Sequence, residues 1–260
     1  ILTPHMGPIE TLLNWLLAAQ CLAEIDEDTQ SWVVRTNIGE QIQKQLLAWL
    51  NHPGTLSIEI RLQDILPRLH FMLDDVTAVA RGRQFAAWSR DQALSILGEM
   101  DGKLASEVLS EIARDEHDDK QVRIQAVDAL GHTHSDEALA ALESLLNNSQ
   151  LRPWVLAALA IHNTPNAARL LLRAWDGTQA AGQAIERLSN PHILPILKQA
   201  LENPVNKLLI HYAFPAIASI GGDEAIDVLN RYLQHKQSAV FEQAVGSLGD
   251  IPQPAACLAL

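Results

Sequence analysis

One pattern of residues recurs about every 30 positions along most of this 260-residue chain, and it limits the possible folds more than any other feature. An aliphatic residue is followed by a small residue that closes a predicted helix, then by a polar turn and a second predicted helix. The small residues, which we call anchors, are Gly98, Gly131, Ala160, Ala218 and Gly246, with the irregular Glu186 between Ala160 and Ala218. Two short helices cannot bury their own apolar faces, so this period indicates repeats that stack.

The apolar positions keep one register from repeat to repeat. Eleven residues after the first five anchors stand Leu109, Leu142, Leu171, Leu197 and Leu229. Spacings of three and four between apolar residues predict helices with one buried stripe, and we expect these five leucines in the core. Thr164-Pro165 and Asn190-Pro191 have the residue types that begin helices, and we expect Ser135-Asp136 and Gly222-Asp223 to do the same.

The predicted fold class is an all-α solenoid of about seven or eight helical hairpins. Residues 1–80 form degenerate repeats in this scheme, with Ala23 as one anchor and a weak repeat within 57–75. Residues 81–260 form the regular repeats of one continuous solenoid, and the last repeat is truncated. Because the chain begins with Ile1 and stops 14 residues after Gly246, we expect a fragment of a longer protein.

Two stretches resemble a known repeat. The segments 126–139 (AVDALG, then DEAL) and 216–225 (AIASIGGDEA) resemble the short HEAT-like repeat of phycobilisome lyases. This resemblance implies a HEAT-like solenoid, a fold that serves many unrelated functions. Leu16–Ile25 also resembles the repeat arrays found C-terminal to NACHT-type signalling NTPases, which implies a segment of a larger signalling protein.

Composition excludes several classes of function. The net charge of −12 argues against nucleic-acid binding, which needs a basic face. The longest apolar run, Trp154–Ile161, has eight residues, whereas a membrane span needs roughly 20. Cys21 and Cys257 lie far apart and form no CxxC pair, so we expect a reducing, cytoplasmic setting.

The motifs of catalysis and cofactor binding are missing from the sequence. Residues 98–104 (GEMDGKL) fall one residue short of a phosphate-binding loop and lack its Ser or Thr. Not one of the ten histidines is followed by Glu, as the di-iron site of HEAT-like deoxyhypusine hydroxylases requires. His132, His134 and His162 fall in equivalent turns, where we interpret them as exposed turn residues, with a shared metal site as the alternative. We therefore expect no catalytic, cofactor or metal site.

Acidic residues concentrate in one part of the chain. Residues 99–143 hold twelve acidic and four basic side chains, a local charge of −8. Such a concentration projects a field that attracts a basic partner, although solubility alone also explains it. The candidate partner-binding residues are Asp115, Glu116, Asp118, Asp119 and Glu137. If they only steer a partner, reversing Asp118, Asp119 and Glu137 to Lys leaves the melting temperature nearly unchanged.

The sequence therefore predicts a non-catalytic scaffold that binds a protein or peptide partner along the face of the second helices. A basic segment is one candidate partner. Within this class we predict a sensor or regulatory fragment of a larger signalling protein. The alternative is a bilin lyase-like protein that loads a chromophore, and a shift of visible absorption on mixing with bilin distinguishes the two. Of the six tryptophans, we expect most to pack between helices and one or two to line a groove.

Overall fold

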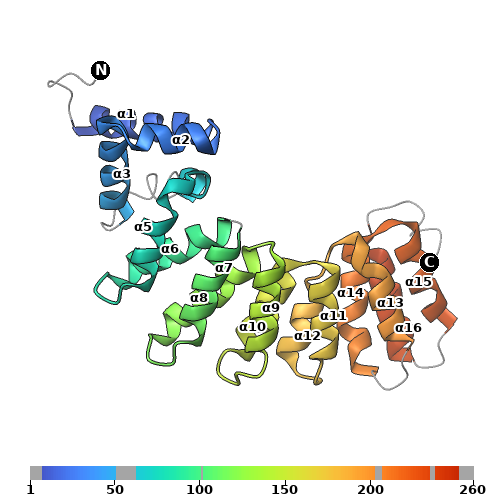
Figure 1. The fold of residues 1–260 in the computed structure, drawn as a ribbon. Coiled ribbons are helices and arrows are strands. Elements are labelled where there is room, and N and C mark those ends of the chain that lie inside the picture. The colour runs from blue at the N-terminus through green and yellow to red at the C-terminus, as the bar shows by residue number, and fades with distance from the viewer. Residues whose placement is uncertain (1–7, 51–62, 101, 203–206, 235–237, 252–260) are drawn as a thin grey trace. The chain divides into compact units, whose positions relative to one another are not determined.

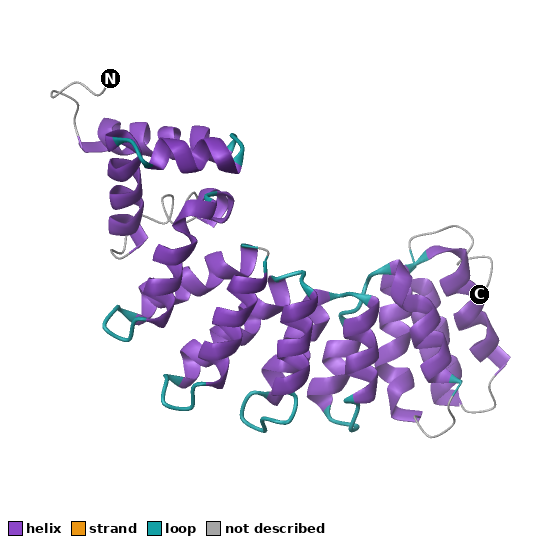
Figure 2. Ribbon diagram, viewed as in Figure 1, coloured by secondary structure: helices purple, strands orange, loops and turns teal. Residues whose placement is uncertain are grey.

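The structure is a computed structural model, and it describes residues 8–50, 63–100, 102–202, 207–234 and 238–251. Every regular element in these ranges is helical (Figures 1 and 2). The α-helices are α1 (Pro8–Ala23), α2 (Glu27–Val34), α3 (Asn37–Leu50), α5 (Leu73–Arg81), α6 (Ala87–Glu99), α7 (Lys103–Arg114), α8 (Lys120–His132), α9 (Asp136–Leu145), α10 (Arg152–His162), α11 (Pro165–Arg173), α12 (Gln179–Glu186), α13 (Leu194–Leu201), α14 (Ile210–Ile220), α15 (Gly222–Asn230) and α16 (Ser238–Gly249). Short 3-10 helices are η1 (Leu66–Arg68), η2 (His70–Met72), η3 (Pro191–Ile193), η4 (Lys207–Leu209) and η5 (Arg231–Gln234). The all-α solenoid of helical hairpins predicted from the sequence is confirmed.

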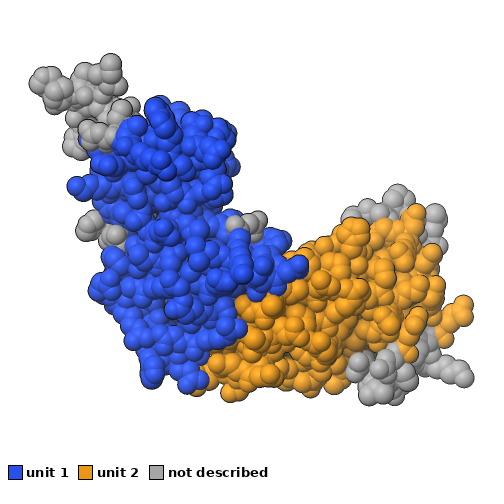
Figure 3. All heavy atoms as spheres, in the orientation of Figure 1, with its two compact units in different colours: residues 1–138 blue, residues 139–260 orange. Residues whose placement is uncertain are grey.

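The chain divides into two compact units, residues 1–138 and 139–260, which Figure 3 colours separately. In the first unit, α6 packs against α5, α7 and α8, and α7 also packs against α8. Nearer the N-terminus α3 packs against α1 and α2, while α2 also contacts η2. The boundary after residue 80 that the sequence suggests stays a prediction.

The second unit shows the regular repeat most plainly. Its first helices pack in the order α10, α12, α14 and α16, and the second helices α11 and α13 pack against each other (Figure 1). Two of these first helices also pack against the second helix of their own repeat, α10 on α11 and α14 on α15. Stacking of this kind gives every hairpin a neighbour that covers its apolar stripe.

The predicted core is confirmed at every leucine of the repeated register. Leu109, Leu142, Leu171, Leu197 and Leu229 are all fully buried. The anchor Gly98 shows why a small residue closes the first helix: a Cβ there would come within 2.9 Å of the Ala129 carbonyl oxygen on α8. Small anchors therefore let the first helices of successive repeats approach closely.

Two anchors depart from the predicted register. Glu186 is exposed at the end of α12, and Gly246 is exposed on α16 with Val245 only half-buried. In α16 the buried positions are instead Val240, Ala244 and Leu248. The anchor assignment at Gly246 is therefore wrong, because α16 turns a different stripe toward the core. The truncated end of the last repeat, residues 255–260, lies outside the described residues.

Capping residues begin three of the four predicted helix starts as expected. The Thr164 side chain accepts a hydrogen bond from the backbone N–H of Ala167, and Ser135 accepts one from Ala138. Asn190 caps η3 in the same way. Gly222-Asp223 does not cap a helix, because α15 already begins at Gly222 and the preceding Gly221 holds a positive φ of 68°. None of the helices in the described ranges is both long enough and apolar enough to span a membrane.

Candidate functional site

Asp118, one of the five predicted partner-binding residues, is held inside the first unit by Arg90. The Arg90 guanidinium on α6 donates to both carboxylate oxygens of Asp118, with Nη1–Oδ1 at 2.8 Å and Nη2–Oδ2 at 2.5 Å. The two side chains are only 5% and 6% exposed. Arg90 also donates from Nε to the carbonyl oxygen of Ala80 at the end of α5, over 2.9 Å. Asp118 therefore joins the turn before α8 to α6 and, through Arg90, to the end of α5.

The charges around this pair alter the pKa values of its members. The hydrogen bond from Arg90 lowers the pKa of Asp118, although burial of the carboxyl group opposes this. The same bond raises the pKa of Arg90. Burial raises the pKa of the neighbouring Asp91, and the positive charge of Arg90 offsets part of that rise. Asp118 is thus an ionised carboxylate committed to a buried ion pair.

Asp115 is also paired with an arginine from the preceding repeat. Its carboxylate accepts a hydrogen bond from Arg83 over 2.5 Å, and the backbone N–H of His117 donates to its other oxygen over 3.0 Å. These bonds, that of His117 first, lower the pKa of Asp115. On the adjacent helix α7, Glu111 is paired with Arg81. Three arginines just before residue 99 therefore neutralise part of the predicted acidic surface.

The other three predicted residues remain on the surface. Asp119 is exposed and serves as the N-cap of α8, where its carboxylate accepts from the backbone N–H of Gln121 over 2.7 Å. Glu116 and Glu137 are exposed. The triple reversal to Lys would break the Arg90–Asp118 pair and a helix cap, so we now expect it to lower the melting temperature. The acidic field as a partner site stays a prediction.

The tryptophans divide into two groups by exposure. Half-buried are Trp15, Trp49, Trp88 and Trp175, the last with its ring edge-on to Tyr212 at 5.8 Å between centroids. Trp32 on α2 and Trp154 on α10 are 68% and 48% exposed. Of these two, Trp154 borders a surface hollow. The expectation that one or two tryptophans line a groove is met at this residue.

The hollow beside Trp154, which we call the Trp154 groove, lies between α10 and α12 in the second unit. Its volume is about 220 Å³. Its walls are Pro153, Trp154 and Ala157 from α10, and Ala180, Gln183, Ala184 and Arg187 from α12 and the residue after it. Ligand pockets usually measure roughly 300 to 1,000 Å³, so this groove fits one apolar side chain better than a cofactor. The only charged side chain on its walls is the exposed guanidinium of Arg187.

Small residues on α12 make the groove possible. Ala180 and Ala184 leave space beside the Trp154 ring, and both belong to a helix with the sequence QAAGQAIE. Gly182 faces the next repeat, where a Cβ would overlap the ring of Tyr212 on α14. One side of α12 therefore packs closely on α14, and another side borders the open groove.

The three turn histidines do not share one environment. His132 and His134 are exposed, as expected of turn residues. His162 is buried, and its Nδ1 lies 3.0 Å from the Thr164 hydroxyl. Its interpretation as an exposed turn residue is wrong, because it packs at the end of α10. Among the described residues, no group of three or more His, Cys, Asp or Glu side chains is placed to hold a metal ion.

Comparison with known proteins identifies the repeat. A family model described as HEAT repeats matches residues 106–186. A search of curated proteins finds no match. The matched segment runs from within α7 to the end of α12, so it includes every wall residue of the Trp154 groove except Arg187. Residues 106–186 are thus similar to HEAT repeats, and repeats of this type suggest a protein-interaction scaffold.

Several solved structures are similar to this chain at low identity. The complex of CpcE and CpcF of phycocyanin lyase from Nostoc sp. PCC7120 is 20% identical, with a TM-score of 0.42, and the match covers 72% of this chain and 79% of that chain. Human deoxyhypusine hydroxylase is 14% identical, with a TM-score of 0.38 and coverages of 94% and 99%. The designed armadillo repeat protein YIII(Dq)4CqI is 15% identical, with a TM-score of 0.29 and coverages of 80% and 98%. The described helices, and not these distant structures, establish the fold.

Proposed function

We propose that this chain is a non-catalytic protein-interaction scaffold that binds a partner peptide in the Trp154 groove. The observation that carries the proposal is an exposed tryptophan above a hollow between two stacked repeats. Tryptophan and arginine are the side chains most enriched among residues that dominate binding energy, and Trp154 and Arg187 both belong to this groove.

The walls of the groove define the chemistry of the partner. Trp154, Pro153 and the three alanines offer apolar surface to one aliphatic or aromatic side chain. Arg187 offers a planar set of donors that suits a carboxylate, and no acidic side chain lines the groove. The proposed partner segment therefore has a large apolar residue followed or preceded closely by Asp or Glu.

This location differs from the one that the sequence favours. The Trp154 groove lies on first helices, whereas the sequence predicts a partner-binding face on the second helices. A groove with its own exposed tryptophan is the more specific candidate, because the exposed second-helix positions Glu143 and Arg173 are already paired with each other. A basic partner at the acidic residues 115–137 remains a separate prediction.

The narrower proposals concern the biological setting. We propose that the scaffold is a sensor or regulatory segment of a larger signalling protein, and this rests on the resemblance of Leu16–Ile25 to NACHT-associated arrays. We propose a cytoplasmic setting on the use of cysteine in the sequence. The bilin lyase alternative stays a prediction, and visible absorption after mixing with bilin tests it directly.

A displayed peptide library tests the proposed function. The library is selected on the whole chain and counter-selected on the Trp154→Ala variant. We expect the enriched peptides to share a large apolar residue next to an acidic one. The Trp32→Ala variant is the matched control, since Trp32 is more exposed than Trp154 but does not line the groove. Peptides that bind all three proteins equally, or no enrichment at all, would contradict the proposal.

A further inference from the structure

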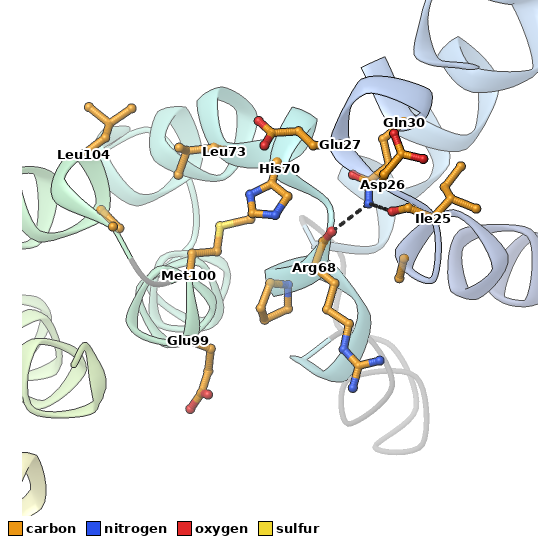
Figure 4. A pocket seen from close by; sticks show the side chains of 14 residues that line it. Ile25, Asp26, Glu27, Gln30, Arg68, His70, Leu73, Glu99, Met100 and Leu104 are labelled. Carbon is orange, nitrogen blue, oxygen red and sulfur yellow. Dashed lines mark hydrogen bonds between the residues drawn. The ribbon is translucent and has the colours of Figure 1, made fainter. Parts of the chain in front are cut away.

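A larger pocket lies in the first unit, apart from the groove described above. It opens where the turn between α1 and α2 meets η1, η2 and the turn between α6 and α7 (Figure 4). Its volume is about 450 Å³, within the range of roughly 300 to 1,000 Å³ usual for ligand pockets. We call it the Gln30 pocket, after the most buried polar side chain on its wall.

Gln30 presents an unused acceptor in this pocket. Its side chain belongs to a residue only 2% exposed, and Nε2 donates to the carbonyl oxygens of Ile25 at 3.1 Å and Arg68 at 3.0 Å (Figure 4). Both amide hydrogens are thereby used, so the remaining atom is the acceptor Oε1. Within the described residues Oε1 is buried with no donor. A buried acceptor without a partner is costly, and Oε1 is itself enclosed, so a donor in the pocket reaches it only after the Gln30 amide turns toward the pocket.

The charged groups around the pocket favour a positive donor. Glu27 and Glu99 line it, and neither has an ion pair within the described part of the chain. Asp26 also lines it, but both of its oxygens are bonded to Thr29, at 2.9 and 2.8 Å. The cation Arg68 on the same wall is paired with Glu24 at 3.0 Å. Two carboxylates without an ion pair in the described residues therefore line a pocket whose guanidinium already has a partner, and in Figure 4 that of Glu99 points away from Gln30.

The remaining wall is apolar and extends the pocket away from these charges. Leu73, Met100 and Leu104 contribute side chains, and Leu104 is 44% exposed at the start of α7. In Figure 4 the thioether of Met100 and the ring of His70 point toward each other across the pocket. An aliphatic chain would lie along this wall while its polar end reached the carboxylates and Gln30.

We infer that the Gln30 pocket binds a lysine side chain of a partner peptide. The ammonium supplies the positive charge that Glu27 and Glu99 favour, while the four methylenes cover Met100 and Leu104. It also supplies the donor that Gln30 Oε1 lacks, once the Gln30 amide turns toward it. This inference rests on the proposed scaffold function but on different residues in the other unit. It also gives the predicted basic partner a specific site.

The test follows the methyl resonance of Met100 by NMR during titration of the whole chain. The probes are Nα-acetyl-lysine methylamide, the uncharged Nα-acetyl-norleucine methylamide and the free diamine cadaverine. We expect the lysine probe to shift the Met100 methyl and the norleucine probe to bind at least about tenfold more weakly, which corresponds to one lost charged contact. Stronger binding by cadaverine than by the lysine probe would indicate a free diamine as the ligand. It would overturn the inference that the ammonium belongs to a peptide.

Variants separate a specific site from a general attraction of cations. The double variant Glu27→Gln, Glu99→Gln is expected to raise the dissociation constant of the lysine probe by about tenfold or more. Asp28→Asn is the matched control, because Asp28 is exposed beside Glu27 on α2 and does not line the pocket. Equal effects of the control and the double variant, or a Met100 methyl that no probe moves, would overturn the inference.

The two proposals fail separately. Trp154→Ala removes the groove in the second unit and is expected to leave the lysine titration unchanged, since Trp154 does not line the Gln30 pocket. Failure of the peptide selection together with normal lysine binding would reject the Trp154 groove alone. Successful peptide selection together with no lysine binding would reject the Gln30 pocket alone.

Discussion

Among the ion pairs of the first unit, we expect loss of the Arg90–Asp118 pair to lower the free energy of unfolding most. The perturbation is Asp118→Ala, which removes the carboxylate and leaves the Arg90 guanidinium in place. That guanidinium belongs to a residue 4% exposed and keeps only its bond to the Ala80 carbonyl oxygen. Two charge-assisted hydrogen bonds disappear, and a buried cation is left without its partner.

The burial of both side chains sets the magnitude. Removing one member of a buried ion pair usually costs about 3 to 5 kcal/mol, because the remaining charge is uncompensated. Exposed pairs contribute about 0 to 1 kcal/mol. Arg83–Asp115 belongs to the second kind, with side chains 55% and 34% exposed. We therefore expect Asp118→Ala to cost at least about 3 kcal/mol and Asp115→Ala to cost much less.

Urea unfolding followed by circular dichroism measures both variants against the wild type. For units of this size about 3 kcal/mol corresponds to a fall of roughly 10 °C in melting temperature, so a thermal scan gives a second reading. The double variant Arg90→Met, Asp118→Leu should recover much of the loss, since apolar side chains can replace a buried pair. Equal stabilities for Asp118→Ala and Asp115→Ala would refute the assignment of Asp118 to the core.

Three further predictions concern stability. Leu171→Ala should cost roughly 2 to 5 kcal/mol in urea unfolding, because this fully buried leucine leaves a cavity, and an unchanged value would refute the repeat register. Gly182→Ala should cost roughly 1 to 3 kcal/mol through overlap with the Tyr212 ring, and a stabilised variant would contradict that packing. The pKa of Asp118 lies below its ordinary value of 3.8 in the folded state, so its stabilisation is present above about pH 4 and is lost as the pH falls through the folded pKa. The stability difference between wild type and Asp118→Ala should therefore shrink in acid. A difference that grows in acid would contradict the lowered pKa of Asp118.

The repeat architecture could be predicted because its signals are local and periodic. Apolar spacings of three and four define each stripe, and a small anchor marks each close approach of first helices, as Gly98 does against Ala129. The same logic located the leucines of the core, from Leu109 to Leu229. The anchor prediction was wrong at Gly246, because a small residue at the expected position does not determine which stripe of α16 faces the core.

The acidic surface was misjudged because charge was counted along the chain and not across repeats. The window began at residue 99, just after Arg81, Arg83 and Arg90, and these arginines pair with residues 28 to 32 positions later. That separation is one repeat period. A second signal was present as well: Arg90 and Arg123 each stand eight residues before an anchor, and both donate to the carbonyl oxygen ten residues earlier. Arginines in this register predict structural contacts.

The two candidate sites depend on features that a single sequence does not reveal. The Trp154 groove exists because Ala180 and Ala184 are small on the side of α12 that faces the ring, which requires the helix rotation to be known. The Gln30 pocket combines three segments that are well separated in the sequence, namely 23–30, 67–73 and 99–105. The first two have no regular period, so their pairing could not be assigned from spacing.

The most direct test of the scaffold account is the affinity of a selected peptide for wild type, Trp154→Ala and Trp32→Ala, measured by titration calorimetry. A residue that dominates an interface costs at least about 2 kcal/mol on truncation, which is roughly a 30-fold loss of affinity. The account predicts a loss of this size for Trp154→Ala and an unchanged dissociation constant for Trp32→Ala. An equal affinity for the wild type and Trp154→Ala would contradict it.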